Sequence, residues 1–125
     1  MKNLLLILSL VSTCASAEWT RVAGNEDLDA YVDVATLRKR EHIVEVWVLL
    51  DYKTSQQWSD YLLYWSMKSQ KEYDCKEARQ HTLSSALHFA HMGERDSVYT
   101  VPGSTAWGYL LPASVDEMLW IFACK

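Results

Sequence analysis

Three histidines close together in the sequence are the side chains best suited to hold a metal ion. They are His81, His88 and His91, and neutral imidazole is a common metal ligand. His81 and His88 are an odd number of positions apart, so on one regular strand they would point to opposite faces. His88 and His91 would meet only across a bend. We therefore predict solvated histidines at a sheet edge, with no metal site and no cofactor.

The cysteines could supply either a nucleophile or a disulfide. Cys75 directly follows Asp74, and an adjacent carboxylate raises the pKa of a thiol, which disfavours a reactive thiolate. Cys14 lies in an N-terminal segment that we expect to be removed, which leaves Cys75 and Cys124. Two cysteines in an exported chain favour a disulfide. Closing a loop of this size contributes roughly 4 kcal/mol in the chain-entropy model.

The remaining charged clusters do not match a reaction or an ion site. The acidic group Glu26, Asp27 and Asp29 lacks the longer oxygen-ligand pattern of a calcium loop, so we expect it to be solvated. Arg38-Lys39-Arg40 is expected to form an exposed basic turn. The chain has no Gly-x-Ser-x-Gly, no phosphate-binding glycine loop and no His-Glu-x-x-His. We predict that the protein is not an enzyme.

The N-terminus predicts export. Lys2 supplies a positive charge, Leu4 to Val11 form a short apolar core, and Ala15-Ser16-Ala17 provides small residues for cleavage. The apolar run is about half of the roughly 20 residues that a membrane-spanning helix needs. Lipidation at Cys14 is the alternative, but Thr13 is an unusual residue before a lipidated cysteine. We predict a signal peptide over residues 1–17 and one domain over residues 18–125.

The charge of the exported part argues against nucleic acid as a partner. The chain has 12 basic and 16 acidic residues, and removal of Lys2 leaves 11 − 16 = −5. Proteins that bind nucleic acid usually carry a basic face. A transmembrane anchor is also not predicted, because no later stretch is long and uncharged enough to span a membrane.

Hydrophobic periodicity predicts several strands. His42 to Tyr52 alternates, with Val44, Val46, Val48, Leu50 and Tyr52 on one face and Glu45, Trp47, Leu49 and Asp51 on the other. The second face could present aromatic anchors to a protein or glycan, or be covered by another element. Further strands are expected over residues 18–23, 30–34, 61–75, 76–89 and 97–101. We expect a bend or bulge in the 76–89 run, a helical turn capped by Asp33, and a loop over residues 53–60.

The end of the sequence changes to a helical period. Ser114 and Glu117 match a capping box, and Val115, Met118, Leu119 and Phe122 recur at helical spacing. A disulfide from Cys124 to Cys75 would fix this helix across the apolar face of the sheet. The predicted fold is α+β, with an antiparallel sheet of about five or six strands packed against a C-terminal helix.

Several short motifs in a shared order resemble the surface-adhesin protein E family of Gram-negative bacteria, over essentially the whole exported part. The motifs are Trp19-x-x-Val22, Tyr31-Val-Asp33, Thr36-Leu-Arg38, Val46-Trp-Val48, Asp51-Tyr-Lys53, Ser66-x-Lys68, Glu72-Tyr-Asp-Cys75, Arg79, Leu83-Ser84, Met92-Gly93, Trp107, Pro112-x-Ser114 and Cys124. The resemblance implies an antiparallel sheet with a C-terminal helix and an exported protein without enzymatic activity. Its namesake is an outer-membrane lipoprotein adhesin that binds host matrix proteins. No matrix-binding segment can be matched here, so no ligand-binding residue is transferred.

The sequence leaves three functions open. The first is an adhesin-like module that is secreted or held at the outer-membrane surface and binds a host matrix or envelope protein. The second is a periplasmic structural or accessory protein that binds another envelope component or forms a homodimer. The third is a metal-binding or small-molecule-binding protein that uses the histidines. Cleavage after Ala17 favours a soluble periplasmic or released domain, whereas a lipid on Cys14 favours a tethered adhesin.

Overall fold

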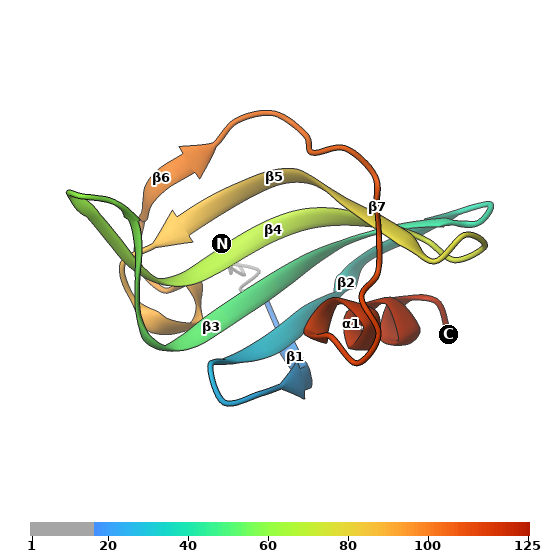
Figure 1. Ribbon diagram of the computed structural model, residues 1–125, viewed down its shortest axis with the longest axis horizontal. Helices are drawn as coiled ribbons and strands as arrows, with labels where there is room; N and C mark the ends of the chain where they lie inside the picture. Colours follow the sequence, from blue (N-terminus) through green and yellow to red (C-terminus); the bar gives the residue numbers. More distant parts are fainter. Residues whose placement is uncertain (1–16) are drawn as a thin grey trace, which may run out of the picture.

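The computed structural model describes residues 17–125, and the predicted signal peptide therefore lies outside the described residues except for Ala17. Residues 17–125 form one antiparallel sheet, a short 3-10 helix and one α-helix (Figure 1). The elements are β1 (Trp19–Gly24), β2 (Leu28–Arg40), β3 (Ile43–Ser59), β4 (Leu62–Asp74), β5 (Arg79–His88), η1 (His91–Gly93), β6 (Ser97–Val101), β7 (Gly108–Tyr109) and α1 (Val115–Ala123). This architecture confirms the predicted α+β fold.

Strand order follows chain order from β1 to β6, and β7 pairs with the start of β5. Each neighbouring pair is antiparallel, as expected when consecutive strands are joined by short turns. α1 contacts β1 and β2. Figure 1 shows the chain running from β6 along β5, crossing the sheet through β7 and then entering α1. We call residues 102–114 the C-terminal connection.

The core lies between α1 and one face of the sheet, which we call the helix face. Val44, Val46 and Val48 are buried there, as their alternation predicts, together with Tyr73 of β4 and Leu119 of α1. β-branched side chains suit a pleated surface that is covered by a helix. The opposite face, which we call the outer face, carries most of the charged side chains of β3 and β4.

β2 is longer than predicted, and the helical turn after Asp33 does not form. The register between β2 and β3 shifts between Asp33 and Arg38. Within this bulge the Thr36 hydroxyl donates to the Asp33 carbonyl at 2.7 Å and accepts from the Trp47 backbone N–H at 3.0 Å. A side chain therefore replaces the missing ladder contact, so the backbone can stay extended.

The predicted loop over residues 53–60 was also wrong, because β3 continues to Ser59. Gln56 and Gln57 pair with Tyr64 and Leu63 of β4. Polar residues can form an extended strand there because the β3–β4 hairpin projects beyond its neighbours, so neither face of the hairpin requires apolar side chains. In Figure 1 the tip of this hairpin lies at the end of the sheet opposite the β4–β5 turn.

The bulge expected in the fifth strand is present at Leu83. Gln70 pairs with Ser84, whereas the adjacent Lys71 pairs with Thr82. The extra residue changes which side chains share a face. His81 pairs with Glu72 and His88 pairs with Ser66, so both histidines lie on the outer face despite their odd spacing. The prediction that His81 and His88 point to opposite faces was therefore wrong.

α1 begins at the predicted capping serine. Ser114 Oγ accepts from the Glu117 N–H at 3.1 Å, and Glu117 Oε1 accepts from the Ala113 N–H at 3.3 Å. The reciprocal bond therefore reaches the residue before the cap rather than the cap itself. Leu119 is buried as predicted, whereas Met118 is exposed. The described α-helix is too short to cross a membrane.

Candidate binding surfaces and the disulfide-linked polar network

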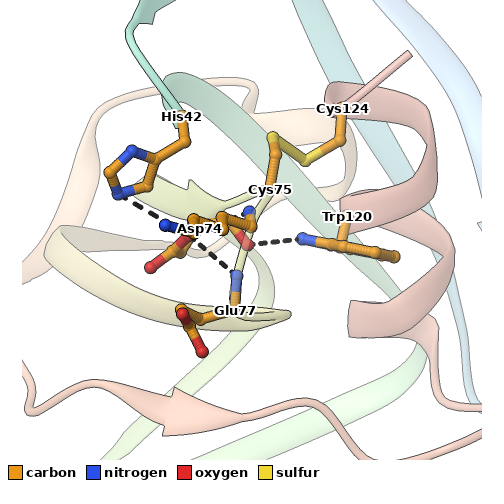
Figure 2. The surroundings of a disulfide bond; sticks show 7 residues. His42, Asp74, Cys75, Glu77, Trp120 and Cys124 are labelled. Atoms are coloured by element: carbon orange, nitrogen blue, oxygen red, sulfur yellow. Dashed lines mark hydrogen bonds and ion pairs between the residues drawn. A yellow bond between two sulfur atoms is a disulfide. The ribbon is translucent and has the colours of Figure 1, made fainter.

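A disulfide joins the β4–β5 turn to the end of α1. Cys75 and Cys124 are bonded, with their Cα atoms 5.6 Å apart (Figure 2). Two hydrogen bonds support the same junction, because Cys75 N–H donates to the His42 carbonyl at 2.8 Å and Trp120 Nε1 donates to the Asp74 carbonyl at 2.9 Å. The bonded sulfur of Cys75 cannot act as a thiolate nucleophile. Cys75 therefore has a structural role.

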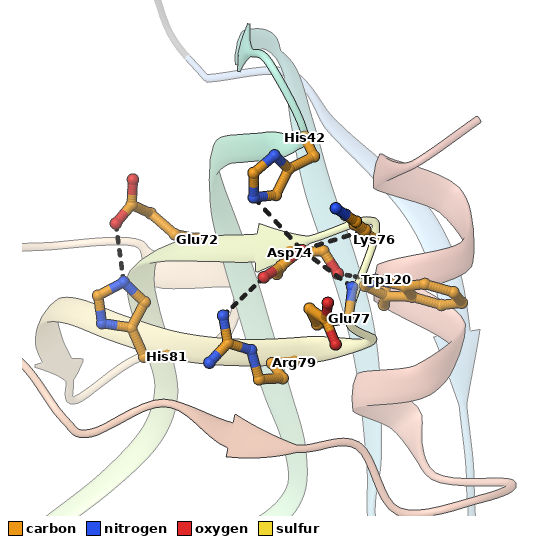
Figure 3. A network of polar contacts seen from close by, with 8 residues as sticks. All are labelled: His42, Glu72, Asp74, Lys76, Glu77, Arg79, His81 and Trp120. Atoms are coloured by element: carbon orange, nitrogen blue, oxygen red, sulfur yellow. Dashed lines mark hydrogen bonds and ion pairs between the residues drawn. The ribbon is translucent and has the colours of Figure 1, made fainter.

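The Asp74 carboxylate organises the β4–β5 turn (Figure 3). Its side chain is fully buried and accepts hydrogen bonds from the Lys76 and Glu77 backbone N–H groups, each at 3.0 Å, and from Arg79 at 2.7 Å. Burial opposes ionisation, but the bonds from Arg79 and the turn, with the nearby His42, outweigh it and lower the pKa of Asp74. The Asp74 bond in turn raises the pKa of Arg79. This turn is held by a charged carboxylate.

A second polar group lies beside this turn on the outer face. His81 Nε2 lies 2.7 Å from Glu72 Oε1, and the His81 ring stacks on Trp107 with ring centroids 4.0 Å apart. The guanidinium of Arg79 lies over the same Trp107 ring at 5.1 Å. Glu72 and Asp74 of this sequence motif therefore hold β5 and the β4–β5 turn, and Cys75 of the same motif is bonded to the end of α1.

The other two histidines have separate partners. His88 is buried, and its Nδ1 lies 3.1 Å from the Arg95 carbonyl. Burial, with the nearby Lys68, outweighs that hydrogen bond and lowers the pKa of His88. His91 Nδ1 lies 2.9 Å from Asp51 Oδ1. The predicted solvated histidines were thus wrong for His81 and His88, which are buried because the bulge turns both toward partners. Within residues 17–125 no group of three or more potential metal ligands is present.

The acidic and basic clusters are local features of the surface. Asn25 Oδ1 accepts from the Asp27 and Leu28 N–H groups, and Asp29 forms an ion pair with Arg21 at 2.9 Å. The Glu26-Asp27-Asp29 group therefore borders a tight turn between β1 and β2. Arg38, Lys39 and Arg40 are exposed as expected, but they form the end of β2 rather than a turn.

The outer face near Leu49 is covered rather than free. Leu49 is fully buried, and η1 contacts β3 and β4 there. Asp51 Oδ1 accepts from the Met92 N–H at 2.9 Å, and Ser66 Oγ bonds to the Ala90 carbonyl and the Gly93 N–H. The sequence left open whether this face binds a partner or is covered by another element. At Leu49 the face is covered.

Exposed aromatic side chains gather instead around the β3–β4 hairpin. We define the hairpin patch as Trp58, Tyr61, Leu63 and Tyr99, all of which are exposed. Tyr61 is 97% exposed, and the Trp58 and Tyr99 rings lie 5.9 Å apart. Below them Tyr52 and Tyr64 form an edge-to-face pair at 5.8 Å. Burial and the neighbouring Tyr64 raise the pKa of Tyr52 to about 12, so this phenol stays neutral.

A groove opens on the helix face between the sheet and the C-terminal connection. Its volume is about 700 Å³, within the roughly 300–1,000 Å³ typical of small-molecule sites. Leu50, Met67 and Ser69 form part of its floor, and Leu111 and Met118 form part of its rim. The sequence did not reveal this groove, because its walls come from segments that meet only through the tertiary fold.

Comparison with known proteins agrees with the motifs and the fold. No curated protein sequence matches the chain. The family model described as surface-adhesin protein E matches residues 19–125. This match includes every described strand and the helix. The chain therefore belongs to the surface-adhesin protein E family.

Proposed function

We propose that the protein is an exported, non-enzymatic binding module that uses the hairpin patch to bind a host matrix or envelope protein. The observation that carries this proposal is the group of exposed aromatic side chains at the hairpin. Membership of an adhesin family supports the binding role. Together they favour recognition of a protein over catalysis.

The hairpin patch has the composition of a protein-binding hot spot. Trp and Tyr are enriched at such sites because they bury a large area and keep a polar atom for hydrogen bonding. Trp58 and Tyr99 already contact each other, so binding would order few additional side chains and lose little conformational entropy. Tyr61 at the hairpin tip would be the first residue to meet a partner.

Export is part of the same proposal. We propose that residues 1–17 are a signal peptide that is cleaved after Ala17, and that the domain begins at Glu18. The Cys75–Cys124 disulfide supports an oxidising compartment, because such bonds persist outside the cytoplasm. The domain would then carry no lipid anchor, and it would be released or held at the cell surface through the protein that it binds.

Localisation tests where the module acts. Intact cells would be treated with a protease and with an antibody against the domain, and the mass of the purified protein would define its N-terminus. We expect a mass that begins at Glu18 and accessibility on intact cells. Protection until the outer membrane is opened would exclude the surface role and favour a periplasmic accessory protein. A lipid-modified Cys14 would show a tethered adhesin.

Binding tests the hairpin patch. The mature chain would be applied to immobilised matrix proteins and, in parallel, to an envelope extract with known components. We expect Trp58→Ala with Tyr61→Ala to weaken binding at least about tenfold, since hot-spot truncations cost about 2 kcal/mol or more. Ile121→Ala is the control, because Ile121 is exposed on α1 and belongs neither to the hairpin patch nor to the groove. Equal binding by both variants would refute the role of the patch.

A further inference from the structure

The groove on the helix face has a polar half and an apolar half. Successive rows of paired residues show this order along the sheet: Leu50 with Met67, then Val48 with Ser69, then Val46 with Lys71. The apolar row is nearer the hairpin and the polar rows are nearer the β4–β5 turn. Met67 and Lys71 are four residues apart on β4, about 13 Å along an extended strand.

Buried hydroxyl groups form the middle of the floor. Ser69 and Ser85 lie opposite each other, are nearly inaccessible to solvent and share one hydrogen bond of 2.8 Å. Two hydroxyl groups carry two protons, and their mutual bond uses only one. Ser69 and Ser85 both line the groove. One hydroxyl proton is therefore not used in this bond and is available to a ligand in the groove, at a place where apolar side chains would have stabilised the sheet more.

Lys71 adds further donors at the polar end. Its ammonium nitrogen lies 3.0 Å from Asp116 Oδ1 of α1, and both residues line the groove. An ammonium group carries three donors, and the bond to Asp116 uses one of them. Asp116 balances the charge of Lys71, so this end offers hydrogen-bond donors without a net positive charge. A ligand here needs acceptor oxygens more than it needs negative charge.

The rim of the groove carries large exposed side chains. Tyr109, Leu111 and Met118 all line the groove and are all exposed to solvent. They belong to the C-terminal connection and α1, and they line the same groove as the apolar floor residues Leu28, Leu50 and Met67. A ligand with an apolar chain would cover these side chains and gain the hydrophobic free energy of their burial.

We propose that this groove binds a single-chain amphiphile, meaning one acyl chain with an oxygen-rich head group. The chain would lie against Leu50, Met67 and the exposed rim. The head group would accept hydrogen bonds from Lys71 and from the Ser69–Ser85 pair. A free fatty acid and a monoacyl phospholipid share this chemistry. This site is separate from the hairpin patch and goes beyond the proposed binding of a protein.

Titration of the purified mature protein with a dansyl-labelled fatty acid tests the proposal, with all lipids kept below their micelle concentrations. Palmitic acid and lysophosphatidylcholine would serve as unlabelled competitors. We expect saturable fluorescence that at least one competitor reverses. Displacement by one alone would identify the source of the head group. The absence of saturable, displaceable binding would overturn the proposal.

A matched pair of helix variants locates the site. Met118 and Ile121 of α1 are each 48% exposed, but only Met118 lines the groove. Because both are on the surface, neither Met118→Asp nor Ile121→Asp should prevent folding, which thermal unfolding would check. We expect Met118→Asp to weaken binding at least about tenfold, or about 1.4 kcal/mol, and Ile121→Asp to leave it unchanged. Equal affinities would overturn the proposed location.

A second pair tests the head-group contact. Ser85→Ala removes a hydroxyl from the floor of the groove, whereas Ser84→Ala changes the neighbouring residue, which pairs with Gln70 on the outer face. Loss of one hydrogen bond of about 1 kcal/mol predicts binding about fivefold weaker for Ser85→Ala. Unchanged binding in Ser85→Ala, with the fold intact, would contradict the role of the serine pair.

Discussion

The two ends of the sheet are built in opposite ways. The disulfide end contains the β4–β5 turn, the Cys75–Cys124 bond and the buried Asp74 carboxylate, which accepts hydrogen bonds from Arg79 and from the turn. The hairpin end carries Tyr61, which is almost fully exposed, and Trp58, which is half exposed and contacts Tyr99 of β6. Figure 1 shows these regions at opposite ends of the long strands.

Under the proposed function, this difference separates the residues that stabilise the fold from those that bind a partner. Glu72, Asp74 and Cys75 at the disulfide end are engaged by contacts within the chain, so these three residues have little left to offer a partner. Residues at the hairpin end contribute little to the core, so their identity can be set by what they bind. A charged motif in a sequence can therefore identify the structurally constrained end of a domain. Exposed hydrophobic residues outside any charged motif can identify the end that binds a partner.

Removal of the disulfide should have the largest effect on stability. Cys75→Ser with Cys124→Ser opens a loop whose ends are 49 residues apart, and the chain-entropy model predicts a loss of about 4 kcal/mol. Urea unfolding of the variant and the oxidised parent measures this loss. The hairpin patch should still bind its partner under conditions where the variant is folded. A loss of under about 1 kcal/mol would show that the bond is not the main constraint.

Removal of the Asp74 carboxylate should have the next largest effect on stability. Asp74→Ala leaves the Lys76 and Glu77 N–H groups without their side-chain acceptor, and we expect a loss of about 3 kcal/mol. The control is Glu77→Gln, a neutralised carboxylate in the same turn that is exposed to solvent. Chemical unfolding of both variants gives the comparison. Similar losses would mean that the net charge of the turn, rather than the buried contacts, sets its stability.

The pH dependence of unfolding tests the role of Asp74. Its pKa is lowered in the folded state, so the unfolded chain takes up the proton more readily and stability falls as the medium becomes acidic. This contribution is complete above the unfolded value of about 3.9 and is lost as pH falls through the lower folded value. We expect Asp74→Asn to flatten this part of the stability profile. An unchanged slope would assign acid unfolding to other carboxylates.

The smallest effect on stability is expected at the hairpin tip. Tyr61→Ala should change the free energy of unfolding by no more than about 0.5 kcal/mol, because surface substitutions without contacts rarely do more. Thermal unfolding measures this change. A loss of more than about 1 kcal/mol would show that the hairpin end is part of the cooperative core and would remove the contrast between the two ends.

Local patterns in the sequence predicted the elements whose two faces differ clearly. The alternation from Val44 to Val48 identified the central strand, and Ser114 with Glu117 identified the start of the helix. The Glu72-Tyr-Asp-Cys75 motif supported the family, although its physical role in the β4–β5 turn became clear only from the contacts of Asp74.

Local sequence patterns did not predict features that depend on pairing between residues far apart in the sequence. Residues 53–59 are polar and resemble a loop, but pairing with β4 keeps them extended. The bulge at Leu83 changed the faces of His81 and His88, and no residue there signals its position. The groove depends on how the C-terminal connection crosses the sheet. Such features follow from tertiary contacts rather than from the period of one segment.

The spacing of the disulfide also constrains how the protein is made. Cys124 follows Cys75 by 49 residues, so β5, β6 and β7 must cross the membrane before the bond can close. During that interval Cys75 remains a free thiol in an oxidising compartment. Within residues 17–125 each cysteine has one intrachain partner. Closing the bond therefore requires an oxidant, whereas the described residues offer no incorrect intrachain pairing that would need repair.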